Sequence, residues 1–219
     1  MAAAGLLLGT SGRAQPQTGS PEDLQKALQR RYELVLDFSA DFTHTYEGGL
    51  LRTTLVERGT VQVKKPGRMR WDYLDPERKL YLSDGERLYS YLPEDRQVII
   101  GRLPAGNEAT TPALFLAGAG DFVDDFTAAY DTVRDPPPES YVLRLTPTRP
   151  ERDFEFLTLV IDARSLAITQ LISRDLQGGL STFVFSNLLE NMGLSDNLFI
   201  FDIPGGTDVI DSTQPDALH

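Results

Sequence analysis

Three aromatic-rich runs between residues 59 and 98 constrain the fold of this chain more than any other feature. Large apolar side chains alternate there with charged ones, as Met69, Trp71 and Tyr73 do with Arg70. A two-residue period is that of a strand with one wet face and one apolar face, and a helix does not produce it. Turn residues separate the runs, so the segment predicts three strands of one antiparallel sheet.

Strand periodicity continues along most of the chain. Alternating runs bounded by Gly, Pro or Asp are expected at about 38–46, 50–64, 67–74, 78–83, 87–92, 96–102, 126–133, 140–146, 153–162, 166–174 and 180–188. Short connections favour antiparallel pairing of sequence neighbours. We therefore expect a mainly β (α+β) fold of about eleven strands. A length of 219 residues fits one large β domain, and no linker or repeat of fixed period divides it.

Two helices are expected beside the sheet. Ser20 and Pro21 form a helix start, and apolar residues at helical spacing predict an amphipathic helix at about 22–36. A shorter helix is expected at 112–117, closed by Gly118. Because this short helix is apolar nearly all round, it needs an apolar surface to cover.

Charge and cysteine content exclude several function classes. The 32 acidic and 21 basic residues give a net charge of −11, which repels phosphate backbones, so no nucleic-acid partner is expected. The absence of cysteine excludes disulfides, thiolate metal sites and cysteine nucleophiles. Residues 1–14 resemble a truncated secretory signal cleaved after Ala14, with a simple apolar tail as the alternative. Residues 15–219 are then expected to form a single domain.

Catalytic chemistry has few candidates in this sequence. Its two histidines are His44 and His219, and it has no nucleophile motif, nucleotide-binding glycine fingerprint or metal-spaced histidine pair. His44 shares a strand face with Phe42 and Tyr46, which favours a structural role. We therefore expect no catalytic residue, no metal, no cofactor and no enzymatic activity.

The apolar face of the sheet has two interpretations, a densely packed core or the wall of a cavity. Tyrosines suit an intermittently wet apolar surface, and the apolar helix at 112–117 is suited to cover one, so we favour the cavity. The basic cluster is equally compatible with a polar outer face and with a docking surface; it consists of Arg58, Lys64, Lys65, Arg68 and Arg70.

Four segments of the sequence together resemble a known family. They are KKPGRMRWDYLDP, LYLSDGERLYSYLPEDRQV, TPALFLAG and FSNLLENMGLSDNLFIFDIPGGTDVI, and the likeness runs from about Leu24 to Ile210. In this order they resemble the LolA family of periplasmic lipoprotein carriers. The resemblance implies a single incomplete, strongly curved antiparallel β-barrel with a helical lid, enclosing an apolar cavity that shields acyl chains.

The resemblance also implies a function and its partners. We expect a monomeric periplasmic chaperone that takes acylated lipoproteins from an inner-membrane lipoprotein-releasing transporter and delivers them to the outer membrane, where an acceptor receives them. A lipid-sensing regulatory domain of similar fold is the alternative.

The resemblance assigns roles to individual residues. The expected cavity wall consists of Met69, Trp71, Tyr73, Tyr89, Tyr91, Phe156, Phe183 and Phe185, and the expected lid of Leu114, Phe115 and Leu116. The family's lid-closing arginine corresponds to Lys65, and a histidine that joins it in some members corresponds to Ala167. Lysine is a compact charge without a planar fork of donors, so we expect Lys65 to latch the lid less firmly than arginine does.

Overall fold

The computed structural model describes residues 19–48, 53–103, 116, 118, 120–151 and 153–213. Its elements in chain order are α1 (Pro21–Glu33), β1 (Asp37–Glu47), β2 (Thr54–Lys64), β3 (Arg68–Asp75), β4 (Lys79–Asp84), β5 (Arg87–Leu92), β6 (Gln97–Arg102), β7 (Phe126–Tyr130), β8 (Ser140–Pro147), β9 (Phe156–Asp162), β10 (Ile168–Arg174), β11 (Leu180–Glu190), the 3₁₀ helix η1 (Asp196–Phe199) and β12 (Asp208–Asp211).

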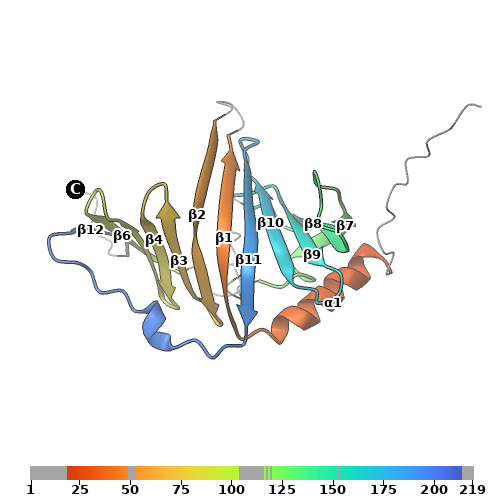
Figure 1. The fold of residues 1–219 in the computed structure, drawn as a ribbon, viewed down its shortest axis with the longest axis horizontal. Helices are drawn as coiled ribbons and strands as arrows, with labels where there is room; N and C mark the ends of the chain where they lie inside the picture. The colour runs from red at the N-terminus through yellow and green to blue at the C-terminus, as the bar shows by residue number, and fades with distance from the viewer. Residues whose placement is uncertain are drawn as a thin grey trace, which may run out of the picture.

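The strands form one curved sheet that is not closed into a barrel (Figure 1). Its strand order is β12-β6-β5-β4-β3-β2-β1-β11-β10-β9-β8-β7, and all pairs are antiparallel except β12 with β6. The expected mainly β, incomplete-barrel fold is confirmed. The strand count of about eleven omits β12, a short parallel edge strand that follows a proline-glycine turn and has no hairpin signal.

The helix α1 begins where its capping residues predict. Ser20 and Asp23 form a reciprocal capping box, and Pro21 occupies the first turn. The helix ends at Glu33, before the predicted position 36, and Leu34 is its C-cap. Leu24 and Leu28 are buried against the sheet, so the apolar stripe of α1 packs on the sheet as expected. No helix among the described residues is long and apolar enough to cross a membrane.

Buried polar contacts fix the position of α1. Gln25 Nε2 donates to the carbonyl oxygens of Phe122 and Phe126, at 2.5 Å and 2.8 Å, and Gln29 Oε1 accepts from the Phe122 amide at 2.9 Å. These bonds tie α1 to the segment that leads into β7. The helix lies along one end of the β7–β10 half of the sheet (Figure 1).

The two faces of the sheet differ in what they contact. We call the face that packs on α1 the inner face; on β3 it carries Met69, Trp71 and Tyr73, all buried. Arg70 and Asp72 lie on the outer face and pair with each other. The alternation predicted for this strand is therefore confirmed.

The segment after β11 covers the outer face beside β2 and β3. Lys64 and Arg68 both pair with Asp196, and Lys64 also donates to the Leu194 carbonyl at 2.7 Å. Arg70 Nη1 donates to the Leu198 carbonyl at 3.3 Å. These contacts within the chain support the polar outer-face interpretation for Lys64, Arg68 and Arg70.

Candidate functional site

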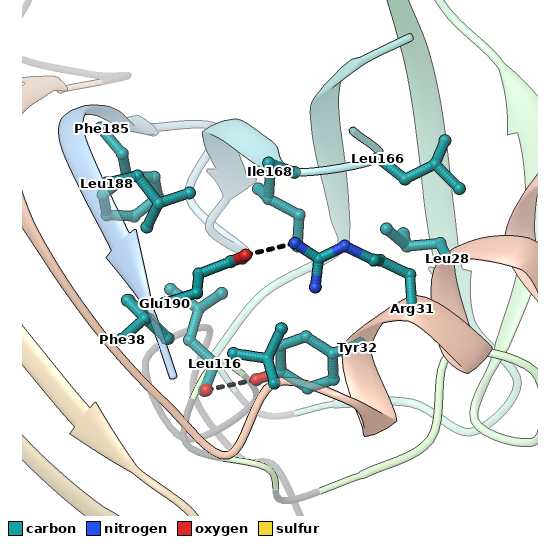
Figure 2. A pocket seen from close by; sticks show the side chains of 12 residues that line it. Leu28, Arg31, Tyr32, Phe38, Leu116, Leu166, Ile168, Phe185, Leu188 and Glu190 are labelled. Atoms are coloured by element: carbon teal, nitrogen blue, oxygen red, sulfur yellow. Dashed lines mark hydrogen bonds and ion pairs between the residues drawn. The ribbon is translucent and has the colours of Figure 1, made fainter. Parts of the chain in front are cut away.

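An apolar pocket lies between α1, β10 and β11 (Figure 2). The empty space between the lining atoms is about 460 Å³ when space open to solvent is included, and the centres of water-sized molecules can occupy about 40 Å³ of it. The inner faces of the strands and the buried side of α1 meet here without filling the space between them. The lining residues are Leu28, Arg31, Tyr32, Val35, Phe38, Leu116, Leu166, Ala167, Ile168, Phe185, Leu188 and Glu190.

Polar links bridge the pocket from α1. The Arg31 guanidinium donates to the Glu190 carboxylate on β11, and both side chains are one quarter exposed. Arg31 Nε also donates to the Ser165 carbonyl at 3.0 Å. The Tyr32 hydroxyl donates to the Leu116 carbonyl, so two neighbouring residues of α1 each make a polar contact across the pocket (Figure 2).

Lys65 lies just after β2 and contacts the C-terminal end of α1. Its Nζ donates to the Tyr32 carbonyl at 2.5 Å and lies 3.1 Å from the centroid of the Tyr32 ring. Burial lowers the pKa of Lys65 to about 8, although Glu33 and Glu190 act in the opposite direction. Gly118 packs so closely that a Cβ there would lie 3.0 Å from Lys65 Cγ. Lys65 therefore joins the sheet to α1 and to the chain just after the expected lid.

Two of the three expected lid residues, Leu114 and Phe115, lie outside the described residues. Leu116 is described, is buried and lines the pocket. Ala167, the position of the family's second closing residue, also lines the pocket. Their assignment to a lid remains a prediction.

The structure brings five of the eight expected wall residues together. Phe42 and Phe183 each have a ring centroid 5.2 Å from that of Trp71, and Phe185 is 6.4 Å away. Tyr73 packs on Phe42 at 4.8 Å, and Met69 belongs to the same buried cluster. We call Phe42, Trp71, Phe183 and Phe185 the aromatic floor. Phe185 lines the pocket, so the floor continues directly from it.

The other three expected wall residues face outward, and their placement on the inner face was wrong. Tyr89 of β5 pairs with Leu82 of β4, which in turn pairs with an outer-face residue of β3. The Tyr91 side chain lies on the same face of β5 as Tyr89. Both rings pack on Phe201, at 5.5 Å and 5.4 Å. Phe156 lies under the Arg144 guanidinium at 4.2 Å. Each aromatic ring thus has a partner on the outer face.

A polar cluster lies beyond the aromatic floor, at the end of the inner face away from the pocket. His44 Nδ1 is 3.2 Å from Glu57, its Nε2 is 2.6 Å from Ser181 Oγ, and Lys79 Nζ is 2.7 Å from Glu57. The imidazole stacks on Phe183 with a centroid distance of 4.2 Å. Burial lowers the pKa of His44 and outweighs the opposing effect of Glu57, so the ring is neutral near pH 7.

The serine hydroxyl contacts the histidine ring, which contacts the glutamate carboxylate, as in the catalytic triad of a hydrolase. The other contacts of these residues favour a structural role. Glu57 is shared with Lys79, and His44 has one ring face covered by Phe183. Among the described residues no group of three potential ligands could hold a metal ion.

A model of the family described as outer membrane lipoprotein carrier protein LolA matches residues 33–202. The chain belongs to the LolA family. An outer-membrane lipoprotein carrier protein of Chromohalobacter salexigens is 33% identical over 199 residues, covering 90% of this chain and 89% of the relative. The one from Methylococcus capsulatus is 31% identical, covering 88% and 92%.

A solved structure has the same fold as this LolA-family chain. An uncharacterised conserved protein from Thermus thermophilus superposes with a TM-score of 0.54 at 13% identity, covering 87% of this chain and 98% of that one. Family membership makes the chain a non-enzymatic binding protein, as expected from its residues.

Several pocket residues were not identified from the sequence. Arg31 and Leu28 belong to the helical stripe predicted for α1, and the stripe indicated burial without showing what the residues enclose. Tyr32 and Glu190 carry no sequence signal of their own, because their roles depend on α1 crossing the end of β11.

Proposed function

We propose that this LolA-family protein is a periplasmic chaperone that shields the acyl chains of lipoproteins in the pocket and over the aromatic floor. It takes them from an inner-membrane lipoprotein-releasing transporter and passes them toward an outer-membrane acceptor. The observation that carries the proposal is the apolar pocket bridged by Arg31 and Tyr32.

The balance of energies in this arrangement suits a reversible carrier. Each buried methylene of an acyl chain contributes about 0.8 kcal/mol, so an acyl chain can supply enough free energy to displace several closing contacts. The Arg31–Glu190 and Tyr32–Leu116 links are half-buried polar contacts, each worth on the order of 1 kcal/mol. Binding is offset by the loss of these contacts, and their re-formation favours release.

Lys65 acts in this proposal as a latch between the sheet, α1 and the lid. Its contacts with Tyr32 and its packing against Gly118 support this role. A lysine donates from one nitrogen, so the latch is weaker than one made by a guanidinium.

The direct test is capture of cargo from periplasmic extract, followed by mass spectrometry for acylated peptides. The wild-type protein is expected to retain lipoproteins. Ala167→Trp, which fills the pocket, is expected to lose them, whereas Arg164→Trp on the neighbouring exposed position should retain them.

Other outcomes of this capture contradict the proposal in different ways. Free lipid without any lipoprotein would favour the lipid-sensing alternative. Equal recovery from both tryptophan variants would show that cargo does not use the pocket.

A further inference from the structure

The indole N–H of Trp71 is a buried donor whose hydrogen bond the described structure does not supply. Trp71 is 3% exposed, and its Nε1 has no hydrogen-bond partner among the described residues. Indole nitrogen can only donate, and a buried donor left without an acceptor is costly. Most buried polar groups of native proteins are hydrogen-bonded, so this donor calls for an explanation.

Polarity changes in one direction along the inner face. Phe38 of β1 lines the apolar pocket, and the next inner position, Ala40, is level with Val61 and Trp71 on β2 and β3. Two inner positions further along β1 is His44, in the polar cluster. Trp71 therefore lies between the mainly apolar pocket, whose charged side chains Arg31 and Glu190 pair with each other, and the polar cluster.

An acylated ligand has the same order of polarity along its length. Its hydrocarbon chain is followed by an ester carbonyl, which accepts hydrogen bonds, and then by a polar head. Phe185 lines the pocket, and its ring centroid is 6.4 Å from that of Trp71. A hydrocarbon chain that occupied the pocket and extended past Phe185 would therefore bring its ester carbonyl to the aromatic floor.

We propose that Trp71 donates its indole hydrogen bond to an ester carbonyl of the bound acyl group, and that this bond orients the ligand with its chains toward α1 and its head toward the polar cluster. The proposal rests on the carrier function and assigns the polar group that its site recognises. The closed form leaves the donor unpaired, which favours the loaded form.

Trp71 is the only tryptophan of the chain, so its indole proton gives a single resonance. The probe is a peptide whose N-terminal cysteine carries a glyceryl group with ester-linked palmitoyl chains, compared with its dihexadecyl ether counterpart. The ester probe is expected to move the indole proton downfield and to bind about fivefold more tightly than the ether probe. A diacyl phospholipid and its dialkyl counterpart form a second pair that distinguishes a lipoprotein from a free lipid.

Substitutions separate the hydrogen bond from packing. Trp71→Phe is expected to bind ester and ether probes equally, and Phe42→Leu in the same aromatic floor is expected to weaken both while keeping the ester preference. Equal affinities and equal indole shifts with the two probes in the wild-type protein would overturn the proposal, and this comparison does not depend on any variant folding.

The remaining outcomes are distinct. An indole proton that stays upfield with both ligands, as expected for a donor already satisfied by the faces of Phe42 or Phe183, also overturns the proposal. An ester preference confined to the phospholipid pair overturns the assignment to lipoprotein cargo. Failure of every probe to bind contradicts the carrier function itself.

Discussion

At the scale of single residues, Gly59 shows how closely the aromatic floor packs against the backbone of the sheet. The register between β2 and β3 shifts between Arg58 and Gly59, and Gly59 pairs with Phe42 on β1. A Cβ at Gly59 would lie 2.0 Å from the Asp72 carbonyl oxygen and 2.8 Å from Phe42 Cζ. The absence of a side chain is what allows the Phe42 ring to lie against β2.

Gly59→Ala is therefore expected to lower the free energy of unfolding by about 3 kcal/mol, because backbone must move to relieve the contact. Urea denaturation measures it. Gly101→Ala in β6 is the matched control, since a Cβ there meets nothing closer than 3.9 Å. Similar unfolding midpoints for the two variants would contradict this account of Gly59.

Lys65 predicts a pH dependence of stability. Burial lowers its pKa from the ordinary value of 10.5 to about 8 in the folded protein, so above pH 8 the unfolded chain binds more protons. The free energy of unfolding should then rise between about pH 8 and about pH 9.5, by no more than about 1 kcal/mol for this half-buried group.

Lys65→Met isolates this effect. Glu33, Glu190, Arg31 and Tyr32 remain in both proteins, so the difference between the two pH profiles belongs to Lys65. Urea unfolding of each protein at about pH 7 and about pH 9.5 gives that difference. Parallel profiles would mean that Lys65 is charged equally in the folded and unfolded chains.

At the scale of elements, the helix α1 is attached to the rest of the molecule near the pocket by several polar side chains. Gln25 and Gln29 hold the helix to the segment before β7, and Arg31 and Tyr32, in its last turn, reach across the pocket. We expect the last turn of α1 to separate from the pocket more readily than the turns that Gln25 and Gln29 hold.

Arg31→Met is expected to increase binding of a fluorescent alkyl probe about fivefold, because the closed form loses its link to Glu190. Amide exchange at the C-terminal end of α1 should accelerate in parallel. Arg30→Met is the control, since Arg30 is exposed on the same helix. Unchanged exchange together with unchanged affinity would show that the ion pair does not hold the pocket closed.

Elements also show how far the sequence predicts the site. The two-residue period placed Met69, Trp71 and Tyr73 together on one face of β3, and that face is buried. The period alone does not say which face of a neighbouring strand is inside. Tyr89 and Tyr91 face outward because the register through the β4–β5 turn places them there. Their burial depends on Phe201, more than a hundred residues later, and no local pattern predicts that contact.

At the scale of the whole molecule, the C-terminal segment protects one side of the sheet. Phe199 is buried, Phe201 packs on two tyrosines of β5, and β12 pairs with the edge of β6. An uncovered strand edge beside an apolar surface is a template for association with another chain.

Removing residues 196–219 is therefore expected to cause self-association, visible in light scattering, and to lower the midpoint of urea unfolding. Removing residues 214–219 alone leaves η1 and β12 in place and serves as the control. A monomeric long truncation that unfolds like the wild type would show that the segment has no protective role.

The sheet has two free ends, β7 and β12, among its described strands. A closed barrel has a circumference that is fixed by its number of strands and their stagger. An open sheet has no such constraint, so its curvature can tighten or relax by small changes of twist shared among many strand pairs, without breaking a ladder bond. Under the proposed carrier function, the capacity of the molecule would then be an elastic property of the sheet, and one protein could enclose acyl chains of different lengths without a separate rigid slot for each.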